Sequence, residues 1–165
     1  MKARNAMTRY HIVIAAMISG LLMQACAGAQ SNSSATMPAG TLVTPGLYKK
    51  ITGIEWQLTK MTLDNKSIDL VANSKTTFTC ANDGRVSGLA TLNRYSGNLK
   101  LLPDGEVIWN KAFIMTRMAG PPELMQQDAN FTQALMQTSR MFLDDSKLAL
   151  RSRDNSTILE FERTE

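Results

Sequence analysis

Residues 78–97 read FTCANDGRVSGLATLNRYSG and carry the clearest pattern of strands and turns in the chain. Asn82-Asp83-Gly84 is typical of the tight turn of a β-hairpin, because asparagine and glycine tolerate positive φ angles. We predict one strand before this turn, over 76–80, and one after it, in which alternate residues from Val86 to Leu92 share a face. Asn93 to Gly97 is then predicted to turn the chain.

The same alternation extends toward the N-terminus. Apolar residues occupy every second position from Ile54 to Leu58, and the pattern continues one position out of phase from Met61 to Leu63. A strand keeps one apolar face through such a slip when an extra residue bulges out, so we predict a β-bulge near Thr59-Lys60. Asp64-Asn65 is then expected to form a turn, and Ile68 to Val71 the returning strand.

Further short strands are predicted on the C-terminal side. They cover residues 99–102, 107–109 and 112–116, and Asp104-Gly105 supplies the turn between the first two of them. Much later in the chain, residues 147–150 and 157–161 have the same character. Turn residues precede each of these two strands, at Asp144-Asp145-Ser146 and at Asp154-Asn155.

A helix is predicted from Pro121-Pro122-Glu123 onward, because proline fits the first turn and an acidic residue stabilises the positive end of the helix dipole. Its apolar face is formed by Leu124, Phe131, Leu135 and Phe142, which are spaced by seven and four positions. The glutamines of this segment lie largely off that face: Gln126, Gln127, Gln133 and Gln137. The expected fold class is therefore α+β and mainly β, with about eight antiparallel strands in a curved sheet or partly closed barrel and one helix packed on it.

The first 25 residues are predicted to be a secretory signal peptide. Lys2, Arg4 and Arg9 precede an apolar run over 12–23. That run is shorter than the roughly 20 apolar residues a membrane-spanning helix needs.

The end of this signal resembles the bacterial lipobox. It reads Leu22-Met23-Gln24-Ala25-Cys26, so we predict that Cys26 is acylated and becomes the first residue of the mature chain. Several buried acyl chains anchor a protein firmly, since each CH₂ contributes about 0.8 kcal/mol. The alternative is an ordinary signal that is cut at Ala27 or Ala29 and discards Cys26.

The remaining chain is divided into a tether and one domain. Residues 26–48 contain the lipidated cysteine and a stretch rich in Ala, Gly, Ser, Asn and Thr, which is predicted to be flexible and unpacked. Residues 49–165 are predicted to form the domain. By resemblance to lipoprotein sorting, Ala27 after the lipidated residue implies the periplasmic face of the outer membrane, with a soluble periplasmic protein as the alternative.

Composition argues against several function classes. The chain has 18 Lys+Arg and 14 Asp+Glu, and three of the basic residues belong to the signal, so the mature net charge is about +1 and nucleic-acid binding is not expected. His11 also lies in the signal, which leaves the mature chain without a histidine for a nucleophile pair or metal site. Cys80 then stands alone and is expected to be a buried thiol. We expect no enzyme, cofactor or metal.

The stretch 78–97 resembles the signature of the META domain, or HslJ-like, family. Three other segments agree with this resemblance: Trp56-Gln57-Leu58 at the start of the domain, Thr116 to Pro121 before the helix, and the closing strands at 148–150 and 159–161. The resemblance covers residues 52–163. It implies a periplasmic β-rich domain whose fold is similar to that of a pilotin, a lipoprotein that chaperones a secretin.

The chain departs from the family pattern at two positions. Leu92 and Gly120 stand where the family commonly carries cysteines. Both cysteines are missing together, as expected if the two normally pair. We therefore expect no thiol or redox role of the kind that the family resemblance implies.

The motif residues fall into two groups. Trp56, Gly84, Gly88 and Gly97 are expected to serve the structure: Gly84 and Gly97 through positive φ angles in turns, and Gly88 through a close approach of backbone to the strand. The candidate binding residues are Arg85, Asn93, Tyr95 and Arg117. Of these, Asn93 is expected to cap the turn, and Tyr95 to pack over the end of the barrel with its hydroxyl exposed.

The functional prediction is a non-catalytic envelope lipoprotein that helps the cell tolerate heat or antibiotic stress by binding a partner. The alternative is a pilotin-like chaperone, which requires an exposed hydrophobic groove for a partner segment or acyl chain. Paired acids at Asp144-Asp145 raise a hydrolase as a third option, but turn residues are usually solvated, so catalysis there is not expected. The membrane, through the lipid anchor, and an envelope protein or hydrophobic ligand are the expected partners, and the oligomeric state is open.

Methionines are frequent around the predicted helix, and an adaptable apolar surface is one explanation of them. Packing in the core is the explanation that we prefer. It concerns Met115, Met118, Met125, Met136 and Met141.

Overall fold

A computed structural model describes residues 40–110 and 112–164 of the chain. The N-terminal strands are β1 (Thr41–Leu42), β2 (Trp56–Leu63), β3 (Lys66–Ile68), β4 (Thr77–Cys80), β5 (Arg85–Leu89) and β6 (Arg94–Leu101). The later strands are β7 (Val107–Trp109), β8 (Ile114–Met115), β9 (Arg140–Asp144), β10 (Lys147–Arg151) and β11 (Ile158–Arg163). The helices are α1 (Pro45–Tyr48) and α2 (Pro122–Gln137). The signal peptide and Cys26 lie outside the described residues.

All these strands belong to one antiparallel sheet with the order β1-β9-β10-β11-β2-β4-β5-β6-β7, to which β3 adds beside β2 and β8 beside β6. Glu106, directly before β7, forms one isolated bridge with Arg140 of β9, and no ladder between β7 and β9 closes the sheet in the described residues. The expected mainly β architecture is thus confirmed in its curved-sheet form, without a closed barrel. The described residues hold 11 strands and two helices, where about eight strands and one helix were expected.

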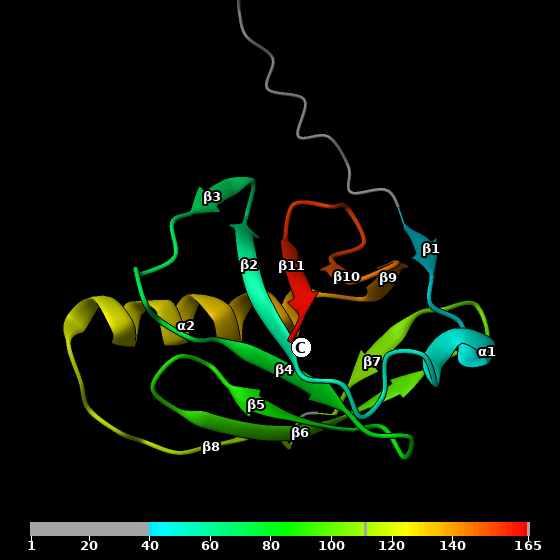
Figure 1. Ribbon diagram of the computed structural model, residues 1–165, viewed down its shortest axis with the longest axis horizontal. Coiled ribbons are helices and arrows are strands. Elements are labelled where there is room, and N and C mark those ends of the chain that lie inside the picture. Colours follow the sequence, from blue (N-terminus) through cyan, green and yellow to red (C-terminus); the bar gives the residue numbers. More distant parts are fainter. Residues whose placement is uncertain (1–39, 111, 165) are drawn as a thin grey trace, which may run out of the picture. The chain divides into compact units, whose positions relative to one another are not determined.

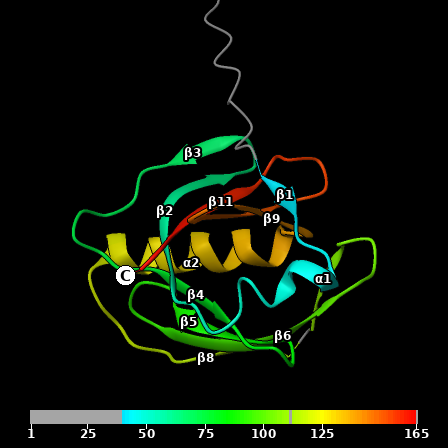
Figure 2. The same cartoon turned by 45° about the vertical axis from the view of Figure 1, so that its right-hand side comes forward.

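The sheet bends around α2, as both ribbon views show: β2, β11 and β9 pass on one side of the helix, and β4, β5, β6 and β8 on the other (Figures 1 and 2). Phe131, Ala134 and Leu135 are fully buried on the helix. Two predictions about the helix are wrong: Phe142, placed on its apolar face, belongs to β9, and Gln127, placed off that face, is buried. None of the helices in the described part of the chain has the length and apolar character needed to cross a membrane.

The predicted bulge in β2 is confirmed. Lys60 pairs with Glu160 and Leu58 pairs with Phe161, so Thr59 is the extra residue in the ladder between β2 and β11. Leu58 and Met61 are both buried, although three positions separate them. One unpaired residue therefore keeps both halves of β2 facing the core.

Of the two turns that flank β5, the first lies where it was predicted and the second does not. Gly84 has a φ angle of +85°, as expected for the turn between β4 and β5. The next turn comes earlier than predicted: the N–H of Ala90 donates to the carbonyl of Asn93 (2.8 Å), and β6 begins directly afterwards. Gly97 therefore lies within β6, where a Cβ would come 2.8 Å from the ring of Phe113, and its predicted positive φ angle is wrong.

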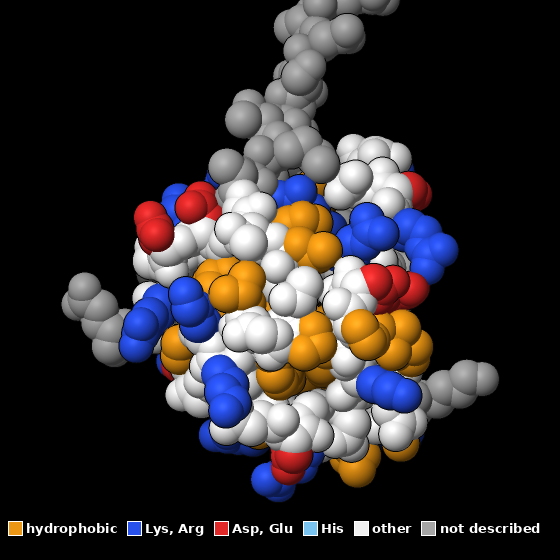
Figure 3. All heavy atoms as spheres, turned by 90° about the vertical axis from the view of Figure 1, so that its right-hand side faces the viewer, with side chains coloured by type: hydrophobic (Ala, Val, Ile, Leu, Met, Phe, Trp, Pro, Cys, Tyr) orange, Lys and Arg blue, Asp and Glu red, His pale blue; other side chains and the backbone are white. Residues whose placement is uncertain are grey.

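The predicted tether is wrong at its C-terminal end, because residues 41–48 are packed. Thr41 and Leu42 pair with β9, and Val43 is fully buried. Tyr48 is buried and donates its hydroxyl to the carbonyl of Ala81 (3.2 Å). The side of the domain that carries α1 faces the viewer in Figure 3. This packing is not visible in the composition, because the strand that β1 pairs with lies about a hundred residues further along the chain.

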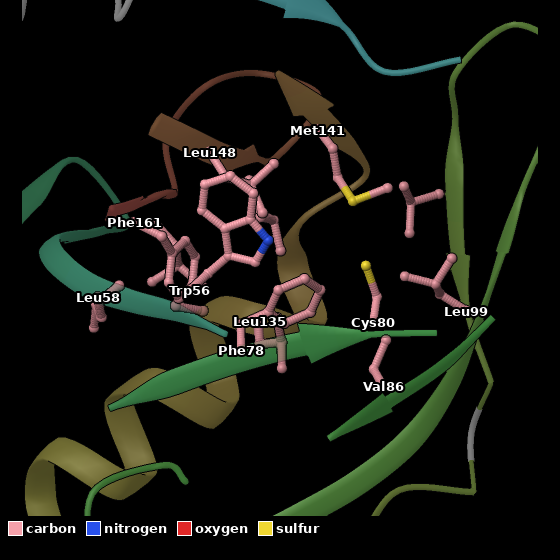
Figure 4. Packing of buried hydrophobic residues seen from close by; sticks show 14 of the residues in the cluster. Trp56, Leu58, Phe78, Cys80, Val86, Leu99, Leu135, Met141, Leu148 and Phe161 are labelled. Carbon is pink, nitrogen blue, oxygen red and sulfur yellow. The ribbon is translucent and has the colours of Figure 1, made fainter. Parts of the chain in front are cut away.

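Large side chains from many elements fill the space inside the sheet (Figure 4). Trp56 is 1% exposed, and its indole N–H donates to the carbonyl of Ile51 (3.1 Å). The rings of Phe78 and Phe161 lie 5.7 Å apart, and Phe131 meets Phe161 edge-on at 6.5 Å. The one polar atom of Trp56 is thus satisfied inside the core.

Candidate functional site

Asn93 lies at the centre of a buried set of hydrogen bonds beside the N-terminal half of α2. Its side-chain Nδ2 donates to Asp128, and its Oδ1 accepts the N–H of Met118 (2.7 Å) and the hydroxyl of Thr116 (3.0 Å). Asp128 also accepts the backbone N–H of Leu92 (3.0 Å). Asn93 is 8% exposed. Its side chain therefore holds three segments together, and both its amide nitrogen and its amide oxygen are engaged within the domain.

Gln127, the neighbour of Asp128, forms a second buried set. Its Nε2 donates to the hydroxyls of Ser74 (2.9 Å) and Thr91 (2.9 Å), and its Oε1 accepts the N–H of Val71 (2.6 Å). It is 3% exposed, so its predicted place off the buried face of the helix is wrong. Two adjacent polar residues of α2 thus anchor the loops that lie over the helix. The helical period did not reveal them, because it counts polar residues as solvent-facing.

Tyr95 is also part of the interior. Its ring stacks on Phe113 at 5.3 Å, and its hydroxyl donates to the carbonyl of Thr77 (2.8 Å). Burial raises the pKa of this hydroxyl well above its ordinary value. Gly88 lies against the same carbonyl group, since a Cβ there would lie 2.1 Å from the Thr77 carbonyl oxygen. The predicted exposure of the Tyr95 hydroxyl is therefore wrong, because Gly88 of β5 has no side chain and leaves room for the hydroxyl to reach the Thr77 carbonyl on β4.

The two arginines are exposed, but they lie far apart along the β5–β6 hairpin. Arg85 stands at the start of β5, where its Nε pairs with Asp83 at 2.7 Å. Hydrogen bonds from the backbone and side chain of Arg85 lower the pKa of that carboxyl. Arg117 lies next to Met118 in the connection from β8 to α2, at the opposite end of the hairpin. The four candidate binding residues therefore do not form one site.

An apolar groove of about 500 Å³ lies between α2 and β8. Both ribbon views place β8 along the rim of the sheet below the helix (Figures 1 and 2). Asp128 is the one charged residue that lines it, and that carboxylate is already bound by Asn93. Its lining residues are Asn93, Met115, Met125, Asp128, Ala129, Thr132, Gln133 and Met136.

The methionines around this groove are more exposed than expected. Met118, Met125 and Met136 are 61%, 47% and 38% exposed, and Met115 is half-buried. Met141 alone of the five is fully buried, so core packing is the wrong explanation for the three exposed ones. A signal for this surface was present in the sequence, since positions 125, 129, 132 and 136 have helical spacing and form a second stripe along α2.

Two other surface hollows differ in character. One, of about 540 Å³, lies beside α1 and is lined by Lys49, Lys100 and Asp83 together with apolar residues. Figure 3 shows the face that carries α1, where hydrophobic side chains alternate with basic and acidic ones. The other, of about 480 Å³, lies along β5 and β6 and is lined by a mixture of small polar and apolar residues together with Arg85. The groove at α2 is distinguished from both by its lack of free charge.

The structure also shows where the remaining candidates for chemistry lie, namely Cys80, Asp144 and Asp145. Burial raises the pKa of the Cys80 thiol to about 11, although a hydrogen bond with Tyr48 opposes this shift. Asp144 and Asp145 are exposed at the turn between β9 and β10. Within residues 40–110 and 112–164, no three His, Cys, Asp or Glu side chains gather in a way that could hold a metal ion.

Solved structures with the same fold are known. An NMR structure of a protein from Burkholderia xenovorans has a TM-score of 0.61 at 21% identity, over 78% of this chain and 93% of that one. A crystal structure of a DUF4847 family protein from Bacteroides vulgatus has a TM-score of 0.52 at 13% identity, over 71% of this chain and 96% of that one. Among curated proteins, none matches this chain. Residues 49–165 match the META domain, and the chain belongs to the META domain family.

Proposed function

We propose that this protein is a non-catalytic binding module of the bacterial cell envelope, held to the membrane through a lipid on Cys26. The observation that carries the proposal is the apolar groove between α2 and β8. Methionine side chains at a surface are adaptable and suit the binding of apolar partners. Contiguous apolar surface on a small domain is typical of an interaction site.

The signature residues support binding at this groove indirectly. Asn93 and Asp128 hold the β5–β6 turn and the connection after β8 against the helix. Their hydrogen bonds therefore fix the distance between the two walls of the groove. A preformed groove of this kind binds without a large ordering cost.

A pilotin-like chaperone is a second candidate, and the same groove favours it. Such a protein requires an open hydrophobic surface, and a closed, well-filled barrel would speak against it. The sheet is open, and Met125 and Met136 remain exposed beside it. In both versions, we propose that the protein acts at the periplasmic face of the outer membrane and supports tolerance of heat or antibiotic stress by protecting an envelope partner.

The anchor is tested by the intact mass of protein purified from membranes, with Cys26→Ala as the control. We expect the mass of a chain that begins at an acylated Cys26, and loss of both the lipid and the membrane association in the variant. A mature chain that starts further along and carries no lipid would overturn the anchor.

Binding at the groove is tested in cells with a photo-crosslinking residue in place of Met125. The matched control carries the same residue in place of Ile108, which is 48% exposed on β7 and lies outside the groove. We expect a discrete crosslinked species at position 125 and none at position 108. Equal crosslinking at the two positions, or none at position 125, would contradict a binding function of the groove.

A further inference from the structure

We propose that the groove takes an extended, uncharged segment of a partner protein, which adds as a strand to the open edge of β8. This inference rests on the proposed function, since it names the occupant of the same groove. Its evidence is the hydrogen bonding of β8, the stripe of residues along α2, and the charge of the lining.

One edge of β8 is available for pairing with an added strand. Thr116 donates its N–H to the carbonyl of Arg94 (3.0 Å), and the N–H of Arg94 donates to the hydroxyl of Thr116 (3.0 Å). The first of these is a main-chain bond and marks Arg94 and Thr116 as a hydrogen-bonded pair. Hydrogen-bonded and non-hydrogen-bonded pairs alternate along an antiparallel ladder, so the next pair, Tyr95 and Met115, is a non-hydrogen-bonded one. The N–H and C=O of Met115 therefore point away from β6, where no other strand of the described residues pairs with β8.

The side chain of Met115 and the helix define where an added strand would lie. Met115 is opposite Tyr95, whose ring lies 5.6 Å from that of Phe131 on α2, so Met115 is on the face of the sheet that faces the helix. A strand added beside β8 would continue that face. Its inward side chains would then meet Met125 and Met136.

The length of the helical stripe sets the length of the segment. Met125, Ala129, Thr132 and Met136 all line the groove and follow one another along one side of α2. Eleven positions separate the first from the last, which corresponds to about 16 Å along a helix. About five residues of an extended strand span the same distance, and alternate ones among them would point toward the stripe.

Charge complementarity defines the chemistry of this segment. Asp128 is 5% exposed and hydrogen-bonded, and the other lining residues are uncharged. A charged side chain placed in the groove would lose its hydration and find no free partner. The inward residues of the segment are therefore apolar. An acyl chain would cover the methionine side chains, but it would offer no hydrogen-bond partner to the N–H and C=O of Met115. A helical segment could not extend the ladder of β8 either.

The experiment uses the full mature chain with Cys26→Ser, prepared without detergent so that the groove stays free. The probes are three pools of uncharged ten-residue peptides of equal composition, built from Val, Ile, Thr and Gln, together with palmitate. The first pool alternates apolar and polar residues, the second has the helical period, and the third is scrambled. Binding is followed by the NMR signals of the methionine methyl groups and of the Met115 amide.

We expect the alternating pool to bind at least about tenfold more tightly than the others and to shift Met115, Met125 and Met136, while the buried Met141 stays unchanged. Methylating alternate backbone nitrogens of the tightest peptide removes its hydrogen-bond donors and should weaken binding at least about tenfold. Met125→Lys and Met136→Lys should each abolish binding. Ile108→Lys is the matched control on an equally exposed residue, and it should change nothing.

The outcomes separate this inference from the proposed function. Binding of palmitate or of the helical pool in preference to the alternating pool would overturn strand addition and leave a binding function intact. Undiminished binding of the methylated peptide would do the same. No binding by any pool, combined with the absence of a crosslink at position 125 in cells, would overturn both.

Discussion

The carboxylate of Asp128 accepts hydrogen bonds from both the backbone N–H and the side-chain amide of Asn93, a residue 35 positions earlier in the chain. Both residues are at least nine-tenths buried. The contact joins the β5–β6 turn to α2 at the floor of the groove. It explains why the asparagine belongs to the interior of this domain.

Asp128→Asn should destabilise the domain. The substitution keeps the shape of the side chain, but its NH₂ group is a donor and would face the N–H donors of residues 92–93 or the side-chain amide of Asn93. A lost hydrogen bond to a buried charged group is worth about 2 to 3 kcal/mol, and we expect a loss of that size in the free energy of unfolding. Urea unfolding measures it. Asn130→Ala, on the same helix, is the control and should change stability by no more than about 0.5 kcal/mol.

Gly88→Ala should be strongly destabilising. Its Cβ would stand 2.1 Å from the Thr77 carbonyl oxygen, a backbone atom that cannot move without disturbing β4, and we expect a cost of about 3 kcal/mol. Gly46→Ala is the matched substitution in α1, where the nearest atom is 4.0 Å away. It should be neutral or stabilise by about 0.5 kcal/mol, because alanine is the better helix former. Equal thermal midpoints for the two variants would contradict the close approach at Gly88.

Cys80 should not react with thiol reagents while the chain is folded. Its side chain is fully buried, pointing into the core beside Met141 and Leu99 (Figure 4), and its pKa is raised to about 11. The thiolate is the reactive form, and at about pH 8 only on the order of one thiol in a thousand would be ionised. The measurement is the rate of modification by a chromogenic disulfide in the Cys26→Ser variant. Rapid reaction should appear only in denaturant; a native rate near that of a free thiol would refute the prediction.

Asp154 should contribute to stability above about pH 4 and lose that contribution in acid. Hydrogen bonds from Ser152 and Ser156 lower its pKa from 3.8 to about 2 in the folded chain. A carboxyl with a depressed folded pKa stabilises at pH values above its unfolded pKa, and the effect disappears as the pH falls through the folded value. The difference in urea midpoint between wild type and Asp154→Asn should therefore shrink between about pH 4 and pH 2. A difference that stays constant across this range would argue against the carboxylate as the cause.

Several turns between successive strands follow from local chemistry and were accessible in the sequence. Asp64 and Asn65 both have positive φ angles between β2 and β3, and Asn155 has one between β10 and β11. Each of these turns depends on residues next to one another in the chain, which is why short-range patterns predict them. The bulge at Thr59 was predictable for the same reason, since a slip in the apolar period marks it.

The candidate site was less accessible. The pattern of turn residues placed Tyr95 in a turn, whereas it lies in β6, and it did not show that a carbonyl on β4 would receive the Tyr95 hydroxyl. Helical spacing identified Phe131 and Leu135 as buried, yet it placed Gln127 on the wrong side. A polar residue is buried where distant groups satisfy its hydrogen bonds, and its own neighbours in the sequence carry no record of them.

The residues alone thus specify the mainly β class, several of the turns and the start of the helix, because a turn or a cap depends on atoms a few positions apart. Three features required the folded chain: the packing of residues 41–48, the burial of Asn93 with Asp128, and the exposure of Met125 and Met136. Each depends on which surfaces meet when the sheet bends around α2. A methionine on a second helical stripe is core when a strand covers it, and here the sheet ends at β8 and leaves that stripe open.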